Sequence, residues 1–168
     1  DTPYRDKPAF NLIYLGRKTG QFLPENEPAT RAEALSWLML VATGIGPYSG
    51  QSVHFTHFAP GENDYAINRY QFEARRHWQL IDDHLQGSDF MVGDSYSIVD
   101  MAVWGWAGPL PFVLNDENAW NAFPNAKRLV DWINARTAAE RAGALKQQHA
   151  FKTEMDDDAR RHMFPQNN

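Results

Sequence analysis

The chain of 168 residues has no cysteine, which excludes disulfide bonds, a protein thiolate as nucleophile and cysteine-ligated metals. It has no apolar run that reaches the roughly 20 residues that a membrane-spanning helix needs. It also lacks a surplus of positive charge: 16 lysine and arginine residues stand against 21 aspartate and glutamate residues, and the formal net charge is −5. Nucleic-acid binding needs clustered positive charge, so we expect no nucleic-acid partner and no membrane partner.

The residues that are present support one well-packed domain, because 43% of them are hydrophobic and 13% are aromatic, with six tryptophans. Aromatic side chains are therefore available to line a cleft as well as to fill a core. The absence of disulfides is consistent with a reducing compartment, and we expect a cytoplasmic protein. The chain begins with aspartate rather than methionine and has no signal-peptide pattern, so we expect a trimmed chain.

Apolar residues recur at helical spacing along most of the chain, and no segment has a persuasive strand pattern. Thr30 and Glu33 have the spacing of a capping box, which predicts a helix start at residue 30. The glycines and the proline at residues 44–47 predict a break or a kink in that helix. The predicted helices cover residues 9–20, 30–42, 64–85, 97–114, 123–137 and 138–151. The sequence thus predicts an all-α bundle of five to six helices, followed by a charged, non-periodic tail.

The segment GDSYSIVD contains a serine and an aspartate that could be a catalytic pair or the start of a helix. A serine nucleophile needs a base and an oxyanion hole, and the segment lacks the G-x-S-x-G pattern of a nucleophile elbow. As an N-cap, Ser97 would accept a bond from the amide of Asp100, whose carboxylate would return one to the amide of Ser97. Tyr96 can pack on Met101 as a hydrophobic staple. We therefore interpret Ser97 and Asp100 as a structural cap.

The histidines and tryptophans give weaker signals. Two pairs of histidines have helical spacing, but neither pair has a third ligand at a convincing position, so no metal site is predicted. Trp104 and Trp106 lie two residues apart and point to different sides of a helix. Either one of them packs in the core while the other faces a cleft, or both belong to the core.

Arg69 lies near the start of the helix expected over residues 64–85, where a positive charge gains nothing from the helix dipole. It therefore needs another stabilising partner. Two interpretations remain open. The side chain is either solvent-exposed and paired with Glu73, four residues later, or it forms a fork that holds a carboxylate of a ligand.

Three segments together resemble the C-terminal helical domain of the glutathione S-transferases, in particular the bacterial Nu-class and disulfide-bond-reductase-like branch. These segments are GIGPYSGQSVHF, YAINRYQFEARR and VGDSYSIVDMAVWGW. The capping segment GDSYSIVD looks like a folding element of this family. RTAAERAGALK is similar to the family's next segment, although Thr137 stands where a proline is usual. The resemblance runs from about residue 10 to residue 151.

The start of the chain, FNLIYLGRKTGQFLP, is similar to the last helix of the family's thioredoxin-like domain and to the interdomain linker. The resemblance therefore divides the chain into residues 1–28, the remnant of that domain with the linker; residues 29–152, the helical domain; and residues 153–168, a polar tail. Lys7 and Pro8 stand where the family has an acidic residue and a serine that hold the γ-glutamyl group. The family's thiol-activating residue has no counterpart, so no catalytic residue is assigned.

The resemblance also implies residues that bind ligands. In the Nu-class pattern the arginine of YAI-x-RY contributes to glutathione binding, and it falls on Arg69. A glutamine that also contacts glutathione falls on Ser36, which departs from the pattern. By position, the residues expected to line a pocket for the electrophile are Tyr48, Gln51, Phe55 and Trp104.

As a function, the resemblance implies a glutathione-dependent transferase or disulfide reductase, without a metal. Glutathione supplies the sulfur, and its thiolate attacks a small hydrophobic electrophile or a mixed disulfide. Family members are usually homodimers. Because most of the glutathione-binding domain is expected to be missing, we expect no turnover by this chain alone. An alternative of a different class stays open, namely a non-catalytic helical module used for assembly or regulation.

Overall fold

The computed structural model describes residues 8–24, 27–149, 154 and 156–167. Within these ranges the regular structure is helical and no strand occurs, which confirms the predicted all-α fold. The chain divides after Ile133 into two compact units.

The first unit begins with α1 (Pro8–Thr19), which agrees with the helix predicted over residues 9–20. Gly20 follows with a φ of 68°, and its amide bonds to the carbonyl of Gly16 at 2.9 Å. Glycine adopts this left-handed conformation without steric cost, so it ends the helix. In the linker, Phe22 has a φ of 60°, which is uncommon for a residue with a side chain. Its carbonyl accepts a bond of 2.9 Å from the amide of Ile98.

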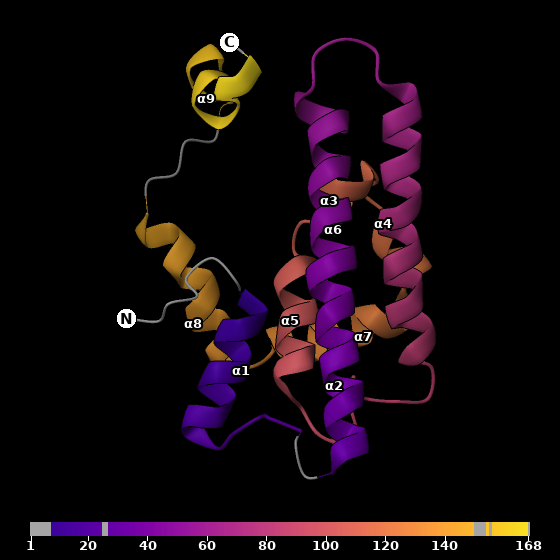
Figure 1. The fold of residues 1–168 in the computed structure, drawn as a ribbon, viewed down its shortest axis with the longest axis vertical. Coiled ribbons are helices and arrows are strands. Elements are labelled where there is room, and N and C mark those ends of the chain that lie inside the picture. Colours follow the sequence, from indigo (N-terminus) through magenta and orange to yellow (C-terminus); the bar gives the residue numbers. More distant parts are fainter. Residues whose placement is uncertain (1–7, 25–26, 150–153, 155, 168) are drawn as a thin grey trace. The chain divides into compact units, whose positions relative to one another are not determined.

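The next four elements, shown end to end in Figure 1, form one continuous helical stretch. They are α2 (Pro28–Leu40), the π-helical turn η1 (Val41–Ile45), α3 (Gly46–Val53) and the π-helical turn η2 (His54–Phe58). The capping box predicted at Thr30 and Glu33 is wrong. Proline favours the first turn of a helix, so Pro28 starts α2 earlier and Thr30 already lies inside it.

Of the break or kink predicted at residues 44–47, the break is absent, because the chain widens into a π-helical turn instead of leaving the helix. Gly44 and Ile45 are buried in η1. Pro47 is the second residue of α3, directly after η1, and it has no N–H group to donate within the continuous helical stretch. The π-helical turn inserts a residue into the helix and so changes which side chains face the next helix.

Helix α4 (Asp64–His84) packs against η1 and α3, and Figure 1 shows it beside them. The buried face of this helix includes Ala74, Trp78 and Ile81, each of which is fully buried or nearly so. Leu85, at the C-cap, is also buried. Burial of such side chains is the dominant favourable term in folding, so α4 is central to the core of the first unit.

The rest of the first unit comprises α5 (Ile98–Ala107), α6 (Leu110–Leu114), the 3₁₀ turn η3 (Ala119–Ala122) and α7 (Pro124–Asn134). Helices α4 and α7 cap one another. Asp82 of α4 accepts bonds from the amides of Asn125 and Ala126 at 2.7 and 2.9 Å. In return, Arg128 of α7 donates to the carbonyls of Leu85 and Ser88 at 3.0 and 2.7 Å. These side chains satisfy groups that a helix leaves unpaired at its ends.

The second unit contains α8 (Thr137–Leu145), the 3₁₀ turn η4 (Lys146–Gln148), α9 (Asp157–Met163) and the 3₁₀ turn η5 (Pro165–Asn167). The tail predicted to be non-periodic thus holds a helix. Its cap is Asp156, whose carboxylate accepts a bond of 2.9 Å from the amide of Ala159. In the part of the chain that the structure describes, no helix is long and apolar enough to cross a membrane.

The structural cap predicted at Ser97 and Asp100 is confirmed. Both bonds of a capping box are present at the start of α5, and the Asp100 carboxylate also accepts the amide of Met91 at 2.8 Å. The same carboxylate accepts the Ser97 hydroxyl at 2.9 Å. Asp100 is fully buried, and this burial raises its pKa although the hydrogen bonds act in the opposite direction. The aspartate therefore fastens α5 to the preceding loop.

Asp100→Ala should lower the free energy of unfolding by about 2 kcal/mol or more, because it removes the cap and leaves the buried Met91 amide without its acceptor. Urea denaturation followed by circular dichroism measures this change. Asp94→Ala is the matched control: Asp94 is exposed in the same loop, and its replacement should change stability by less than about 0.5 kcal/mol. Equal effects of the two substitutions would show that the cap contributes nothing.

Candidate functional site

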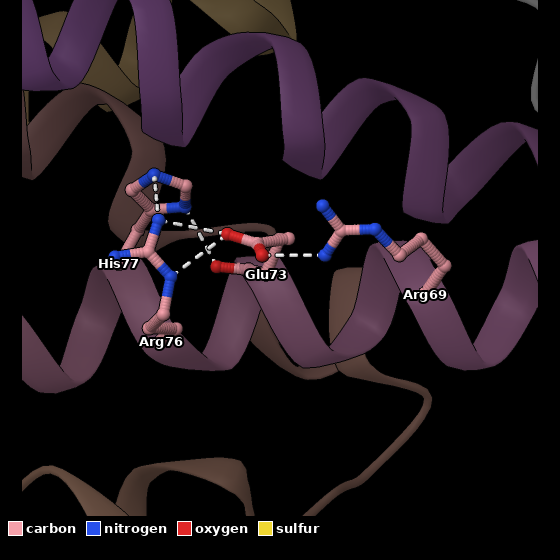
Figure 2. Close-up of polar contacts among 4 residues, drawn as sticks. All are labelled: Arg69, Glu73, Arg76 and His77. Carbon is pink, nitrogen blue, oxygen red and sulfur yellow. Dashed lines mark hydrogen bonds and ion pairs between the residues drawn. The ribbon is translucent and has the colours of Figure 1, made fainter.

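A buried carboxylate on α4 binds two arginines, as Figure 2 shows. Oε1 of Glu73 accepts a bond of 2.5 Å from Nη1 of Arg69, and Oε2 accepts one of 2.8 Å from Nε of Arg76. The Glu73 side chain is 10% exposed, whereas those of Arg69 and Arg76 are 47% and 48% exposed. The bonds from Arg69 and then Arg76 lower the pKa of Glu73, so it stays ionised. Two half-exposed guanidinium groups are thus bonded to one buried carboxylate.

His77, one turn further along α4, is buried and connects this cluster to η1. Its Nδ1–H donates to the carbonyl of Glu73 at 2.6 Å, which leaves Nε2 as an acceptor for Arg76 at 3.4 Å. Burial lowers the pKa of His77, with a smaller contribution from the charge of Arg76, so the ring is neutral near pH 7. Gly44 of η1 lies against the ring: a Cβ at that position would be 2.6 Å from Nε2. The close approach of η1 to α4 therefore requires glycine.

Aromatic rings from η2, α3 and α4 line the region next to Arg69. Tyr48 lies 6.1 Å from Tyr70 and 5.2 Å from His77, measured between ring centroids. Phe55 stacks on Tyr70 at 5.4 Å with an angle of 8° between the planes. The structure thus brings two of the predicted pocket residues, Tyr48 and Phe55, together on the residue that follows Arg69. Parallel rings of this kind present flat apolar surface.

Another predicted residue, Ser36, lies on α2. Ser36 is exposed on α2, and its hydroxyl donates to the carbonyl of Ala32 at 2.8 Å. Its neighbour Trp37 lies 4.3 Å from His84, between ring centroids, at the far end of α4. His84 follows Arg69 by 15 positions, or about 22 Å along a helix. The structure therefore does not bring Ser36 and Arg69 together within one chain.

Of the two remaining predicted pocket residues, one lies on α3 and the other on α5. Gln51 is exposed on α3, and Trp104 is half-buried on α5. The interpretation of one tryptophan as a cleft residue fits Trp106, because Trp106 lines a cavity of about 650 Å³ and packs on Gly46. Trp104 and Trp106 are both half-buried, so neither is a fully buried core residue.

The cavity of about 650 Å³ lies between α1, the α2–η1 segment and α5, and sequence reasoning missed it. Its larger lining side chains are Phe10, Leu12, Leu15, Met39, Met101 and Trp106. No local pattern identifies such a set, since the lining residues come from helices far apart in the sequence. By contrast, the spacing of Arg69, Glu73 and Arg76 on one helix face is a local signal that could have predicted their cluster.

No group of three or more histidine, aspartate or glutamate side chains in the described residues could hold a metal ion. Of the pair that departs from the γ-glutamyl-binding pattern, Lys7 lies outside the described residues and Pro8 begins α1.

The arginine cluster and the rings beside it offer guanidinium groups and aromatic surface to a ligand. Such a site suits an anionic ligand with a flat or apolar part.

No family model matches the chain. Over 138 residues it is 37% identical to the disulfide-bond oxidoreductase YfcG of Escherichia coli, a match that covers 78% of this chain and 59% of that protein. It is 43% identical over 98 residues to the disulfide-bond oxidoreductase YghU of the same organism, with 58% of this chain and 33% of that protein covered. The chain thus corresponds to only part of the length of these relatives.

The chain is also similar to solved structures of glutathione transferases. A glutathione transferase family member from Pseudomonas fluorescens, solved with two glutathione bound, has a TM-score of 0.73 and 36% identity, with 79% of this chain and 60% of that chain covered. A glutathione transferase from Burkholderia graminis, solved with two glutathione molecules per subunit, has a TM-score of 0.72 and 33% identity. That match covers 81% of this chain and 58% of the other.

Gly44→Ala should lower the free energy of unfolding by about 1–3 kcal/mol, because the new Cβ would collide with the buried ring of His77. The matched control is Gly50→Ala on α3, where a Cβ meets nothing within 4 Å. An alanine there should be neutral or stabilise the helix by up to about 1 kcal/mol. Urea denaturation compares the two variants. Similar stabilities of the two would contradict the close approach at Gly44.

His77 should make the protein less stable as the pH falls through about 6.5, its ordinary pKa. Because its pKa is lowered on folding, the unfolded chain binds a proton there that the folded protein does not bind, so stability is retained above this pH and lost below it. Urea denaturation at pH 7.5 and pH 5.5 should show a smaller loss for His77→Gln than for the wild type. His162→Gln, which alters an exposed histidine, should behave as the wild type. Equal losses in all three proteins would contradict a neutral buried His77.

Proposed function

This chain belongs to the glutathione S-transferase-like proteins, and we propose that it is the helical part of a glutathione-dependent transferase or disulfide reductase. The observation that carries the proposal is the similarity to YfcG and to transferases solved with glutathione bound. Two relatives named as disulfide-bond oxidoreductases favour the enzyme over a non-catalytic module. We also propose the domain division described above, with residues 1–28 as the remnant of the thioredoxin-like domain and the linker, residues 29–152 as the helical domain and residues 153–168 as the polar tail.

Arg69 is the proposed contact of this chain with a carboxylate of glutathione. Its guanidinium is half-exposed and is fixed by Glu73, which engages one of five N–H donors. The remaining donors can form the paired bonds by which arginine holds a carboxylate. Glutathione has two carboxylates, so it matches this chemistry. Ser36 is a second proposed contact. Because it lies at the other end of the helix pair from Arg69, the two residues would contact one glutathione only from two different subunits.

In the proposed reaction glutathione supplies the sulfur, and the absence of cysteine from this chain is compatible with that role. The glutathione thiolate attacks one sulfur of a mixed disulfide, the sulfur–sulfur bond breaks, and the other sulfur leaves as a thiolate that takes up a proton. In the transferase reaction the same thiolate forms a carbon–sulfur bond with a hydrophobic electrophile, and a leaving group such as chloride departs with the electrons of the bond that breaks. The residues of this chain orient the peptide and the electrophile; the proposed pocket residues are Tyr48, Gln51, Phe55 and Trp104.

The assembly that we propose is a cytoplasmic homodimer. Large apolar side chains are exposed on α2 and α4, and they are suited to a protein interface. These side chains are Leu35, Met39, Tyr65 and Phe72, with exposed fractions between 40% and 85%.

Arg69→Ala should weaken glutathione binding by about 10-fold or more, since it removes charge-assisted hydrogen bonds. Isothermal calorimetry on the full-length gene product measures the affinity, and reduction of hydroxyethyl disulfide by glutathione measures the activity. Arg75→Ala is the matched control, because Arg75 lies on the same helix and pairs with Asp116 at 3.2 Å. Unchanged affinity in Arg69→Ala would sink the role of Arg69. The proposed enzymatic function is wrong if the full-length gene product accelerates neither the reduction of hydroxyethyl disulfide by glutathione nor the reaction of glutathione with a chlorinated aromatic acceptor.

A further inference from the structure

The Glu73 carboxylate is held on both sides, which distinguishes the Arg69–Glu73 pair from an ordinary surface ion pair. An exposed pair of long side chains contributes little, because both lose rotamer freedom when they meet. Glu73 is largely buried and its second oxygen is already bonded to Arg76. Its position is therefore fixed independently of Arg69. An arginine that binds such an acceptor is itself fixed in position.

The charge of the cluster explains why two arginines share one carboxylate. A ligand carboxylate that approaches Arg69 also meets the negative charge of Glu73, so a neutral Arg69–Glu73 pair would attract it weakly. Arg76 adds a second positive charge on the other oxygen of Glu73. The three side chains then have a net charge of about one positive unit, because arginine remains protonated in proteins. The exposed end of the cluster stays attractive to an anion.

The buried ring of His77 adds no charge to this cluster. His77 donates its Nδ1–H to the backbone of Glu73 and accepts from Arg76 through Nε2, so it is a neutral support for Arg76. The ring of Tyr48 lies against His77 on the other helix. The cluster thus combines an acceptor that is fixed in position (Glu73), a donor that Glu73 fixes (Arg69) and a cation that balances the charge of Glu73 (Arg76).

We propose that Glu73 is a positioning residue that holds Arg69 for the carboxylate of its ligand, while Arg76 balances the charge of Glu73. This proposal rests on the proposed function, because it takes glutathione as the ligand. Neither Glu73 nor Arg76 touches the ligand in this account. Glu73 acts through the orientation of Arg69, and Arg76 acts through the electrostatic potential at that guanidinium.

A double-mutant cycle on the full-length gene product tests the proposal, with reduced glutathione as the ligand in isothermal calorimetry. Glu73→Gln should weaken binding by about 5-fold, because Arg69 loses its charged acceptor. In an Arg69→Ala background the same change should have no further effect. With saturating hydroxyethyl disulfide, Glu73→Gln should raise KM for glutathione and leave kcat unchanged. Glu62→Gln, which removes an exposed negative charge before α4, is the control and should leave binding unchanged.

The outcomes separate this proposal from its premise. If Glu73 did not position Arg69, removing its negative charge would tighten the binding of an anion. Tighter or unchanged binding in Glu73→Gln, together with weaker binding in Arg69→Ala, therefore overturns this proposal and leaves the proposed function standing. Additive effects in the double mutant overturn it as well. If Arg69→Ala has no effect, the premise and the proposal fall together.

If Glu73→Gln does not fold, Arg76→Gln provides the second measurement, because Arg76 is half-exposed. This variant keeps Glu73 ionised beside Arg69 alone and removes the balancing charge. It should weaken glutathione binding by about 5-fold at low salt and less at high salt, where charges are screened. Binding equal to that of the wild type at low salt overturns the proposal.

Discussion

The contact between Gly44 and the ring of His77 sets the spacing of the two longest helical segments. With no side chain at residue 44, the π-helical turn η1 approaches α4 closely enough to bury the imidazole. The burial leaves His77 neutral and directs its Nδ1–H to the backbone one turn earlier. The same spacing places Tyr48 on His77 and Tyr70. A steric constraint at one backbone position thus determines the surroundings of the arginine cluster.

Two buried carboxylates in this unit have opposite electrostatic surroundings. Asp100 is bonded to neutral backbone amides and a hydroxyl, and burial raises its pKa. Glu73 is bonded to two arginines, which lower its pKa. Donors without net charge can fasten a helix, but they cannot offset the desolvation of an anion as fully as cations do. Asp100 thus fastens the start of a helix, whereas Glu73 binds two half-exposed arginines.

The sequence predicted those features that depend on neighbours within one or two helical turns. The cap at Ser97 and Asp100 and the pairing of Arg69 with Glu73 are of this kind, and both are present. The capping box predicted at Thr30 was wrong, because Pro28 starts the helix earlier. At residues 44–47 the chain accommodates its glycines in a π-helical turn and does not break. The cavity beside Trp106 could not be predicted, since it depends on how α1, η1 and α5 pack.

The bond from the Ile98 amide to the Phe22 carbonyl has a practical consequence for protein expression. The first amides of α5 have a full set of acceptors only when the linker is present, because Ser97 accepts the next two and Phe22 accepts that of Ile98. A fragment designed to begin at residue 29 would expose the first of these amides and the apolar side chains around it. The linker is therefore part of the minimal folding unit, and an expression boundary belongs before α1 rather than before α2.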